Sequence, residues 1–139
     1  MTREDVIRYA RMWLGTPYVH QGRLMGVGVD CIGLVAGVGQ YFGLPYEDRR
    51  GYAPTGQGDF YLTNEFVKWM DPVYTAHAQP GDVACFWVRK PTFICHCGIL
   101  TPVGLIHVHS IIGHVAEHVM DAGWKKRFAC AFRFRGMKD

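Results

Sequence analysis

The stretch Gly26-Val-Gly-Val-Asp-Cys-Ile-Gly-Leu-Val35 decides the fold. Asp30 is a residue type that caps helix N-termini, and the residues after it, as far as Phe42, are apolar on nearly every side of a helix. Such a helix is buried, and Gly43 is a typical residue to end it. The stretch therefore predicts a buried helix with Cys31 in its first turn.

The predicted position of Cys31 has two interpretations. A thiol becomes a useful nucleophile when its pKa is lowered, and the free N–H groups and dipole of a helix N-terminus have this effect. The same N–H groups can stabilise the oxyanion of a tetrahedral intermediate. The alternative is a core cysteine, because cysteine is among the most buried residue types. Position alone leaves both interpretations open.

Helical patterns flank this stretch. Thr2 and Asp5 resemble a capping box, and Gly15 is expected to end the helix that follows. The inward side of that helix is expected to carry Val6, Ala10, Trp13 and Leu14. The other segments of this half are expected to be loops at 21–29 and 46–58 and a third helix at about 60–70.

After Pro80-Gly81 the period changes from helical to alternating, which is typical of strands. Strands are expected at 82–88, 93–100, 105–110, 114–120 and 128–134. Residues 101–104, Thr-Pro-Val-Gly, have the chemistry of a tight hairpin. One face of the last strand is expected to carry Phe128, Cys130, Phe132 and Phe134. Helices followed by consecutive antiparallel strands indicate the α+β class, and residues 1–139 fit a single domain.

A base for Cys31 must be a histidine that is close in space rather than in sequence. Alternation along 93–100 places Cys95 and Cys97 on a core face and His96 on the other face, beside Gly98. Glycine there leaves room for an approaching group. A lone histidine at such a position is more often structural, so His96 needs a partner to support a catalytic role.

Two histidines of the next strand can be that partner. His107 and His109 share a face, and the hairpin brings this face alongside His96. Either can accept the second ring N–H of His96 and orient it. Simple hairpin pairing places His109 directly opposite His96 and His107 diagonally. Sequence geometry leaves both candidates open.

The chain also carries a set of short motifs in a defined order: Gly15-Thr-Pro-Tyr18, the stretch 26–35, Pro80-Gly-Asp-Val83, His96-Cys-Gly-Ile99 and Leu105-Ile-His107. This set resembles the NlpC-type cell-wall cysteine peptidases, particularly the short single-domain branch found with phage tails and phage-like particles. The resemblance covers nearly the whole chain, from about Met1 to Phe134. It implies a reduced papain-like fold, in which the nucleophile helix packs on a small antiparallel sheet that supplies both histidines.

The resemblance also implies roles for single residues. Cys31 matches the family nucleophile, His96 the general base and His107 the third, orienting residue. Tyr18 matches a tyrosine that lines the cleft and contributes to the oxyanion hole, and Asp30 matches a residue that contacts the amino group of the substrate in some members.

Three positions depart from the family pattern. Ile32 follows the nucleophile where many members have Ser or Ala, so the substrate contact that those members make there would involve a different side chain. Cys97 follows the base where many members have Val. His109 is an additional histidine and is an alternative to His107 as the third residue.

By resemblance, the expected reaction is hydrolysis of an amide bond in a peptidoglycan stem peptide, at the bond joining D-γ-glutamyl to the diamino acid. No cofactor is expected. The expected partners are the stem peptide and the tip or hub proteins of a phage-type tail.

Composition and the N-terminus bear on location. Net charge is +3, and no apolar run approaches the ~20 residues of a membrane helix, so we expect neither a nucleic-acid ligand nor membrane insertion. The N-terminus runs directly into the first amphipathic pattern, so we expect no signal peptide. The expected route is synthesis in the cytoplasm, incorporation into a phage or phage-like tail, and action in the periplasm or cell wall.

Other interpretations compete with this one. Cys95-His96-Cys97 lacks the C-x₂₋₄-C spacing of structural zinc sites, so we expect no metal, and the five cysteines are expected to be reduced. A catalytically silent structural tail protein, or an amidase or acyltransferase on the same scaffold, remain the alternatives. The other histidines are expected to be ordinary surface residues: His20, His77, His114 and His118.

Overall fold

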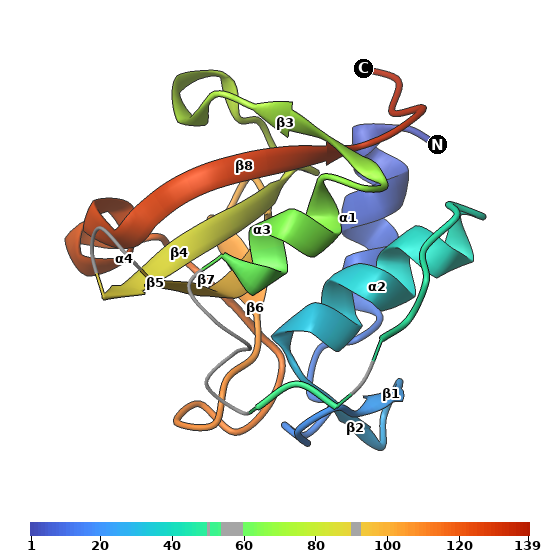
Figure 1. The fold of residues 1–139 in the computed structure, drawn as a ribbon, viewed down its shortest axis with the longest axis vertical. Helices are drawn as coiled ribbons and strands as arrows, with labels where there is room; N and C mark the ends of the chain where they lie inside the picture. The colour runs from blue at the N-terminus through green and yellow to red at the C-terminus, as the bar shows by residue number, and fades with distance from the viewer. Residues whose placement is uncertain (50, 54–59, 90–92) are drawn as a thin grey trace.

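The computed structural model describes residues 1–49, 51–53, 60–89 and 93–139. Within these ranges an antiparallel sheet has the strand order β3-β8-β4-β5-β6-β7 (Figure 1). Its strands are β3 (Met70–Val73), β4 (Val83–Arg89), β5 (Phe93–Leu100), β6 (Leu105–His107), β7 (Ala116–His118) and β8 (Phe128–Phe134). The helices are α1 (Arg3–Arg11), α2 (Cys31–Tyr41), α3 (Tyr61–Phe66), η1 (Thr75–His77) and α4 (Ala122–Arg127). The predicted α+β class is confirmed.

Helix α1 begins as the sequence predicts. The Thr2 hydroxyl accepts the N–H of Asp5, and the Asp5 carboxylate accepts the N–H of Thr2, which completes a capping box. The predicted inward residues are buried except Leu14, which is 41% exposed because α1 ends at Arg11 and Leu14 lies in the turn beyond it. The termini lie together (Figure 1), where Thr2 bridges to Lys138.

Helix α2 is buried along most of its length, as predicted, with Asp30 as its N-cap. Its glycines permit close packing: a Cβ at Gly37 would lie 2.5 Å from the Trp13 ring, and one at Gly39 would lie 2.3 Å from the Trp69 ring. These contacts hold the second half of α2 against the turn after α1 and the segment before β3. The helix that carries Cys31 in its first turn is therefore held by the core of the domain.

Several local predictions are wrong. The expected loop at 21–29 contains a short hairpin, β1 (Arg23–Leu24) and β2 (Gly28–Val29). The expected third helix is shorter, and Met70 begins β3, an edge strand that tolerates Pro72. Helix α4 was not expected. Of the expected loop at 46–58, residues 46–49 and 51–53 are indeed irregular, and the rest lie outside the described residues.

The strands from 82 onward occur in the predicted order, and β5 and β8 have the predicted bounds. β6 and β7 are shorter than predicted, so His109, which was expected in the strand at 105–110, lies in the turn after β6. The turn at 101–104 closes through a bond from the Thr101 N–H to the Gly104 carbonyl, and the Thr101 hydroxyl accepts the N–H of Gly104. Gly98 pairs with His107 and Leu100 with Leu105, which is the register predicted for a four-residue loop.

Two of the register shifts among β4, β5 and β8 change which face certain residues occupy. Cys85 pairs with Cys130 but Phe86 pairs with Phe128, so Ala129 is the extra residue of β8. Phe128 consequently packs on the opposite face from Phe132 and Phe134, and the prediction that all four residues share a face is wrong.

The second shift lies beside His96. Phe86 pairs with His96 and Trp87 pairs with Ile94, which leaves Cys95 as the extra residue of β5. Ile94 therefore packs in the same core as Cys97, although strict alternation along the strand would place the two residues on opposite faces.

The sheet separates two hydrophobic clusters. The larger lies between the sheet and α1, α2 and α3, and it includes Val83 and Cys97. The smaller lies on the other face, where Phe86 and Leu105 pack with Trp124 of α4. Within the described ranges, none of the helices has the length and hydropathy to span a membrane.

Candidate active site

Cys31 is the first residue of α2 and is partly buried. Its carbonyl oxygen accepts the thiol of Cys97 at 3.3 Å, and its own thiol points toward the carbonyl oxygen of Cys95 at 3.8 Å. Both residues that flank His96 in β5 therefore contact Cys31. The helix N-terminus and the strand that carries His96 are joined at this point.

The N-cap of α2 is also the centre of a polar network. Asp30 is 4% exposed, and its carboxylate accepts the N–H of Gly33 and of Gln21, each at 2.8 Å, and the guanidinium of Arg23 at 3.0 Å. The Tyr52 hydroxyl is a fourth donor. Four donors match the acceptor capacity of a carboxylate. Contact between Asp30 and a substrate amino group would have to displace one of them.

Arg23 connects this network to the loop after α2. It lies between Asp30 and Asp48, at 3.0 and 2.9 Å, and donates to the Tyr52 hydroxyl at 2.7 Å. Burial raises the pKa of Tyr52, and the neighbouring Asp30 carboxylate acts in the same direction. Gly33 makes the arrangement possible, because a Cβ there would lie 2.4 Å from the Gly22 carbonyl oxygen.

Tyr18 lies beside the nucleophile. Its backbone forms a β-bridge with Val29 of β2, and its N–H donates to the Gly113 carbonyl. Tyr18 therefore connects β2, which leads into α2, with the loop after β6. Burial raises the pKa of the Tyr18 phenol, and nearby Asp30 and Cys31 add to this. The phenol therefore stays protonated at neutral pH and is a potential hydrogen-bond donor.

His96 projects from β5 onto the face that carries Phe86. Its Nε2 lies 2.8 Å from Nδ1 of His107, so the two rings share one hydrogen bond. Gly98 allows this approach, because a Cβ at Gly98 would lie 2.8 Å from the Cβ of His107, its partner across the strands.

His109 has a different environment. Its ring centroid is 5.5 Å from that of His96, and its Nδ1 accepts the backbone N–H groups of Ile111 and Ile112 at 3.2 and 3.4 Å. The ring therefore caps the turn that follows β6. Of the two sequence candidates, His107 is the one within hydrogen-bonding distance of His96.

His118 extends the arrangement and was expected to be a surface residue. Its Nε2 lies 2.6 Å from Nε2 of His107, and its Nδ1 lies 2.8 Å from the Val119 carbonyl oxygen. A signal was present in the sequence: His96, His107 and His118 are each 11 residues apart. That spacing places the three histidines diagonally to one another on three consecutive strands. The register of β7 against β6 depends on the turn that joins the two strands, and the sequence did not predict that turn.

Trp124 of α4 covers these rings. Its ring centroid lies 4.7 Å from that of His107, in an edge contact, and 5.4 Å from that of His96. The Arg127 guanidinium lies over the Trp124 ring, 4.1 Å from its centroid. No sequence pattern predicts Trp124 at this place, because α4 is short and has no apolar periodicity. Trp124 therefore packs against all three hydrogen-bonded histidines, since its ring centroid is also 6.2 Å from that of His118.

The electrostatics of the site favour neutral histidines. Burial lowers the pKa of His96 well below its usual range, and His107, His109 and Arg127 act in the same direction. Burial also lowers the pKa of His107 to about 3. At neutral pH His96 therefore has one ring nitrogen with a free electron pair, as a general base requires.

The cysteines next to His96 differ from a nucleophile. Burial raises the pKa of Cys95 to about 11, and burial also raises that of Cys97. Both stay protonated at neutral pH. Among the described residues no Cys31–His96 hydrogen bond is present, and the thiol must leave the Cys95 carbonyl before it can reach the base. Catalytic hydrogen bonds are often long before substrate binds.

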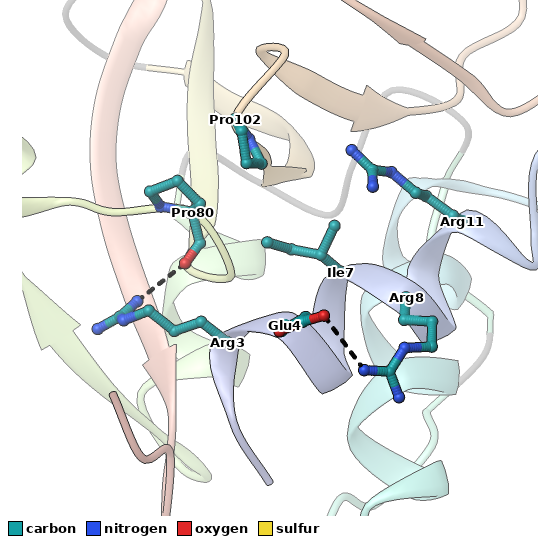
Figure 2. A pocket seen from close by; sticks show the side chains of 7 residues that line it. All are labelled: Arg3, Glu4, Ile7, Arg8, Arg11, Pro80 and Pro102. Carbon is teal, nitrogen blue, oxygen red and sulfur yellow. Dashed lines mark hydrogen bonds and ion pairs between the residues drawn. The ribbon is translucent and has the colours of Figure 1, made fainter.

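No group of three or more His, Cys, Asp or Glu side chains in the described ranges is arranged to hold a metal ion. A separate hollow of about 420 Å³ runs along α1 (Figure 2). It is lined by Arg3, Glu4, Ile7, Arg8, Arg11, Pro80 and Pro102. Each arginine is bound to a carboxylate: Arg3 to Asp82, Arg8 to Glu4 and Arg11 to Glu117. These ion pairs account for the charged residues of the hollow.

A scan against protein-family models gives no match, and a search of the curated proteins gives none either. Solved structures do match. An NlpC/P60 family protein from Bacillus cereus ATCC 10987 has a TM-score of 0.73 at 22% identity, over 96% of this chain and 40% of its own. A protein similar to lipoprotein, of the NLP/P60 family, from Staphylococcus aureus subsp. aureus Mu50 has a TM-score of 0.68 at 18% identity, over 99% and 42%.

The third similar structure is a single domain. The NlpC/p60 domain of the peptidoglycan hydrolase SagA has a TM-score of 0.64 at 21% identity, over 96% of this chain and 100% of that domain. This chain thus spans about two fifths of the first two proteins and all of the SagA domain. Its fold, with the Cys31 helix packed on an antiparallel sheet, is the papain-like α+β fold of NlpC/P60 domains.

Proposed function

We propose that this protein is a cysteine peptidase that cleaves peptidoglycan stem peptides, with Cys31 as nucleophile and His96 as general base. The observation that supports this most is the hydrogen bond that joins one His96 ring nitrogen to His107, in the strand whose neighbouring residues contact Cys31. The His96 ring lies on the Phe86 face of the sheet and the described residues include no contact between it and the Cys31 side chain, so the reaction requires the two side chains to approach each other. The fold adds support, because one protein that shares it is a peptidoglycan hydrolase.

The proposed reaction has two steps. His96 removes the thiol proton through Nδ1, and the Cys31 sulfur attacks the amide carbonyl carbon. His96 then gives the proton to the leaving amine as the C–N bond breaks, and a thioester remains on Cys31. His96 then takes a proton from water as the water oxygen attacks the thioester carbon, the C–S bond breaks and the acid leaves, and His96 returns the proton to the Cys31 sulfur. Free N–H groups at the start of α2 stabilise the oxyanion in both steps, and the Tyr18 phenol is proposed to assist them.

His107 and Asp30 are proposed to position these groups. His107 orients the His96 ring through the hydrogen bond between them. Asp30 fixes the first turn of α2, and with it the direction of the Cys31 side chain, through the network with Arg23 and Tyr52. The Asp30–substrate contact implied by the sequence resemblance would need this network to open.

The bond and the place of action are narrower proposals that rest on the sequence resemblance. We propose the D-γ-glutamyl–diamino acid bond as the target and the tip or hub of a phage-type tail as the partner. Action would then be in the periplasm or cell wall. Mass spectrometry of purified phage-like particles from the cells that encode this chain tests the location: peptides of the chain support it, and their absence from particles that contain the other tail proteins contradicts it.

The reaction is tested by digesting purified peptidoglycan with wild type, Cys31→Ala and Cys130→Ala, and identifying soluble products by mass spectrometry. Cys130 is a matched control because it is a partly buried cysteine in β8. We expect stem-peptide fragments from wild type and Cys130→Ala and none from Cys31→Ala. A folded wild-type protein that releases no fragments contradicts the proposal, and newly formed amide cross-links would indicate an acyltransferase.

A further inference from the structure

Three histidines from three adjacent strands form a continuous hydrogen-bonded chain. His96 lies on β5, His107 ends β6 and His118 ends β7. Their rings are joined from His96 Nε2 to His107 Nδ1 at 2.8 Å and from His107 Nε2 to His118 Nε2 at 2.6 Å. The chain ends at the Val119 carbonyl oxygen, 2.8 Å from His118 Nδ1. The reaction proposed above uses the first two histidines and leaves His118 without a role.

The carbonyl at the end of the chain determines the tautomer of every ring. A carbonyl oxygen only accepts hydrogen bonds, so Nδ1 of His118 carries hydrogen. In neutral His118 the other nitrogen, Nε2, then has an electron pair and accepts the N–H of His107 Nε2. Neutral His107 consequently accepts at Nδ1, and the donor to it is the N–H of His96 Nε2. The electron pair of His96 is left on Nδ1.

We propose that His118 is a positioning residue for the proposed peptidase reaction: it holds His107 and His96 in the tautomers that leave the basic electron pair on Nδ1 of His96, the nitrogen that His107 does not occupy. The inference rests on the proposed function for its catalytic meaning. The hydrogen-bonded chain itself is a property of the free protein and can be tested without substrate.

The test compares three substitutions. His118→Leu keeps the bulk but removes the acceptor, whereas His118→Gln supplies an amide oxygen near the position of Nε2 and takes up no proton. His77→Leu is the control, because His77 lies in η1 and is exposed. Nitrogen-15 NMR of the histidine rings reports which nitrogen of His96 carries hydrogen, and hydrolysis of a stem peptide gives kcat and KM across pH.

We expect His96 to carry hydrogen on Nε2 in wild type, His77→Leu and His118→Gln. In His118→Leu we expect the Nδ1-protonated form to appear and kcat to fall roughly tenfold with little change in KM, because a buried ring nitrogen of His107 loses its partner.

Several results would overturn the inference. One is hydrogen on Nδ1 of His96 in the wild type at neutral pH. Another is a His118→Leu variant that keeps the wild-type tautomer and kcat. The third is a His118→Gln variant as impaired as His118→Leu, which would mean that His118 contributes packing alone. If the wild type cleaves no stem peptide, the proposed function fails, and the NMR spectra still decide whether His118 sets the tautomers.

Discussion

His107 and His109 lie next to each other behind His96, yet their ring nitrogens have different partners. His107 bonds to His96 and His118, whereas His109 accepts two backbone N–H groups of its own turn. Simple hairpin pairing predicted His109 opposite His96, but β6 ends at His107 and His109 lies in the turn beyond it. The diagonal His107 is bonded because the absence of a side chain at Gly98 leaves room for it.

Substitution separates the roles of these two histidines. His107→Gln should lower kcat by roughly 10–100-fold, the range typical of residues that orient a functional histidine. His109→Gln should leave kcat near wild type and affect mainly the turn after β6. Steady-state hydrolysis of a stem peptide measures both. A larger loss of kcat for His109→Gln than for His107→Gln would assign the orienting role to His109.

The residues of the site could be predicted from the sequence to different extents. Cys31 and its helix follow from the cap and the apolar pattern, and His96 follows from alternation beside a glycine. The choice between His107 and His109 could not be predicted, since it depends on which ring fits over Gly98. His118 and Trp124 depend on the turns that bring β7 and α4 back to β5, and neither turn has a diagnostic motif.

At the scale of elements, the N-terminus of α2 is held by one carboxylate. Asp30→Ala should lower the free energy of unfolding by about 3–5 kcal/mol, because buried Arg23 loses a charged partner and three other donors lose their acceptor. Urea denaturation measures this change.

Asp121, the N-cap of α4, provides a matched control for Asp30. It is exposed and accepts the N–H of Trp124, so Asp121→Ala should cost about 1 kcal/mol. Equal losses for the two substitutions would mean that Asp30 acts as an ordinary cap, without the network to Arg23 and Tyr52.

The hairpin of β5 and β6 depends on Gly98 in a comparable way. Gly98→Ala should destabilise the fold by about 1–3 kcal/mol, because the new methyl group would lie 2.7 Å from the Ile106 carbonyl oxygen and 2.8 Å from the His107 Cβ. It should also displace the His107 ring and so lower kcat. Thermal unfolding and stem-peptide hydrolysis measure the two effects.

Gly123→Ala is the control for Gly98→Ala, since its Cβ would meet only the Asp121 side chain, at 3.3 Å. The free energy of unfolding of the Gly123→Ala variant should differ little from that of the wild type, because Gly123 lies in α4 and alanine has a higher helix propensity than glycine. A Gly98→Ala variant as stable and active as this control would show that the strands can separate without disturbing the site.

Elements differ in how well the sequence predicts them. The capping box of α1, the cap of α2 and the turn at 101–104 are local, and each lies where it was expected. β3 was missed because Pro72 disguises an edge strand, and Phe128 was assigned to the wrong face because a bulge at Ala129 interrupts the alternation. Such bulges depend on how neighbouring strands pair, and a local sequence pattern does not predict that pairing.

At the scale of the whole molecule, buried neutral histidines couple folding to pH. The pKa of His107 is about 3 in the folded protein, against an unfolded value of about 6.5. As pH falls below about 6.5 the unfolded chain binds the proton first, so stability is complete above that pH and declines below it. The slope for one such histidine approaches about 1.4 kcal/mol per pH unit.

Urea denaturation between pH 7.5 and 5 tests this coupling. His107→Gln should reduce the slope by about one proton. The groups around His107 are His96, His109 and His118 from the neighbouring strands and turn, and Arg127 from α4. Glu117, whose pKa is lowered by its bond from Arg11, contributes only at lower pH. Identical slopes in wild type and variant would mean that His107 is protonated in the folded state.

The claim that Cys31 attacks the substrate is tested most directly by intact-mass measurement of the protein quenched in acid during turnover of a stem peptide. We predict that part of the wild-type protein gains the mass of the acyl half of the substrate, that the added mass maps to the peptide containing Cys31, and that Cys31→Ala shows neither adduct nor turnover. An adduct on another cysteine, or continued turnover by Cys31→Ala, would contradict the account.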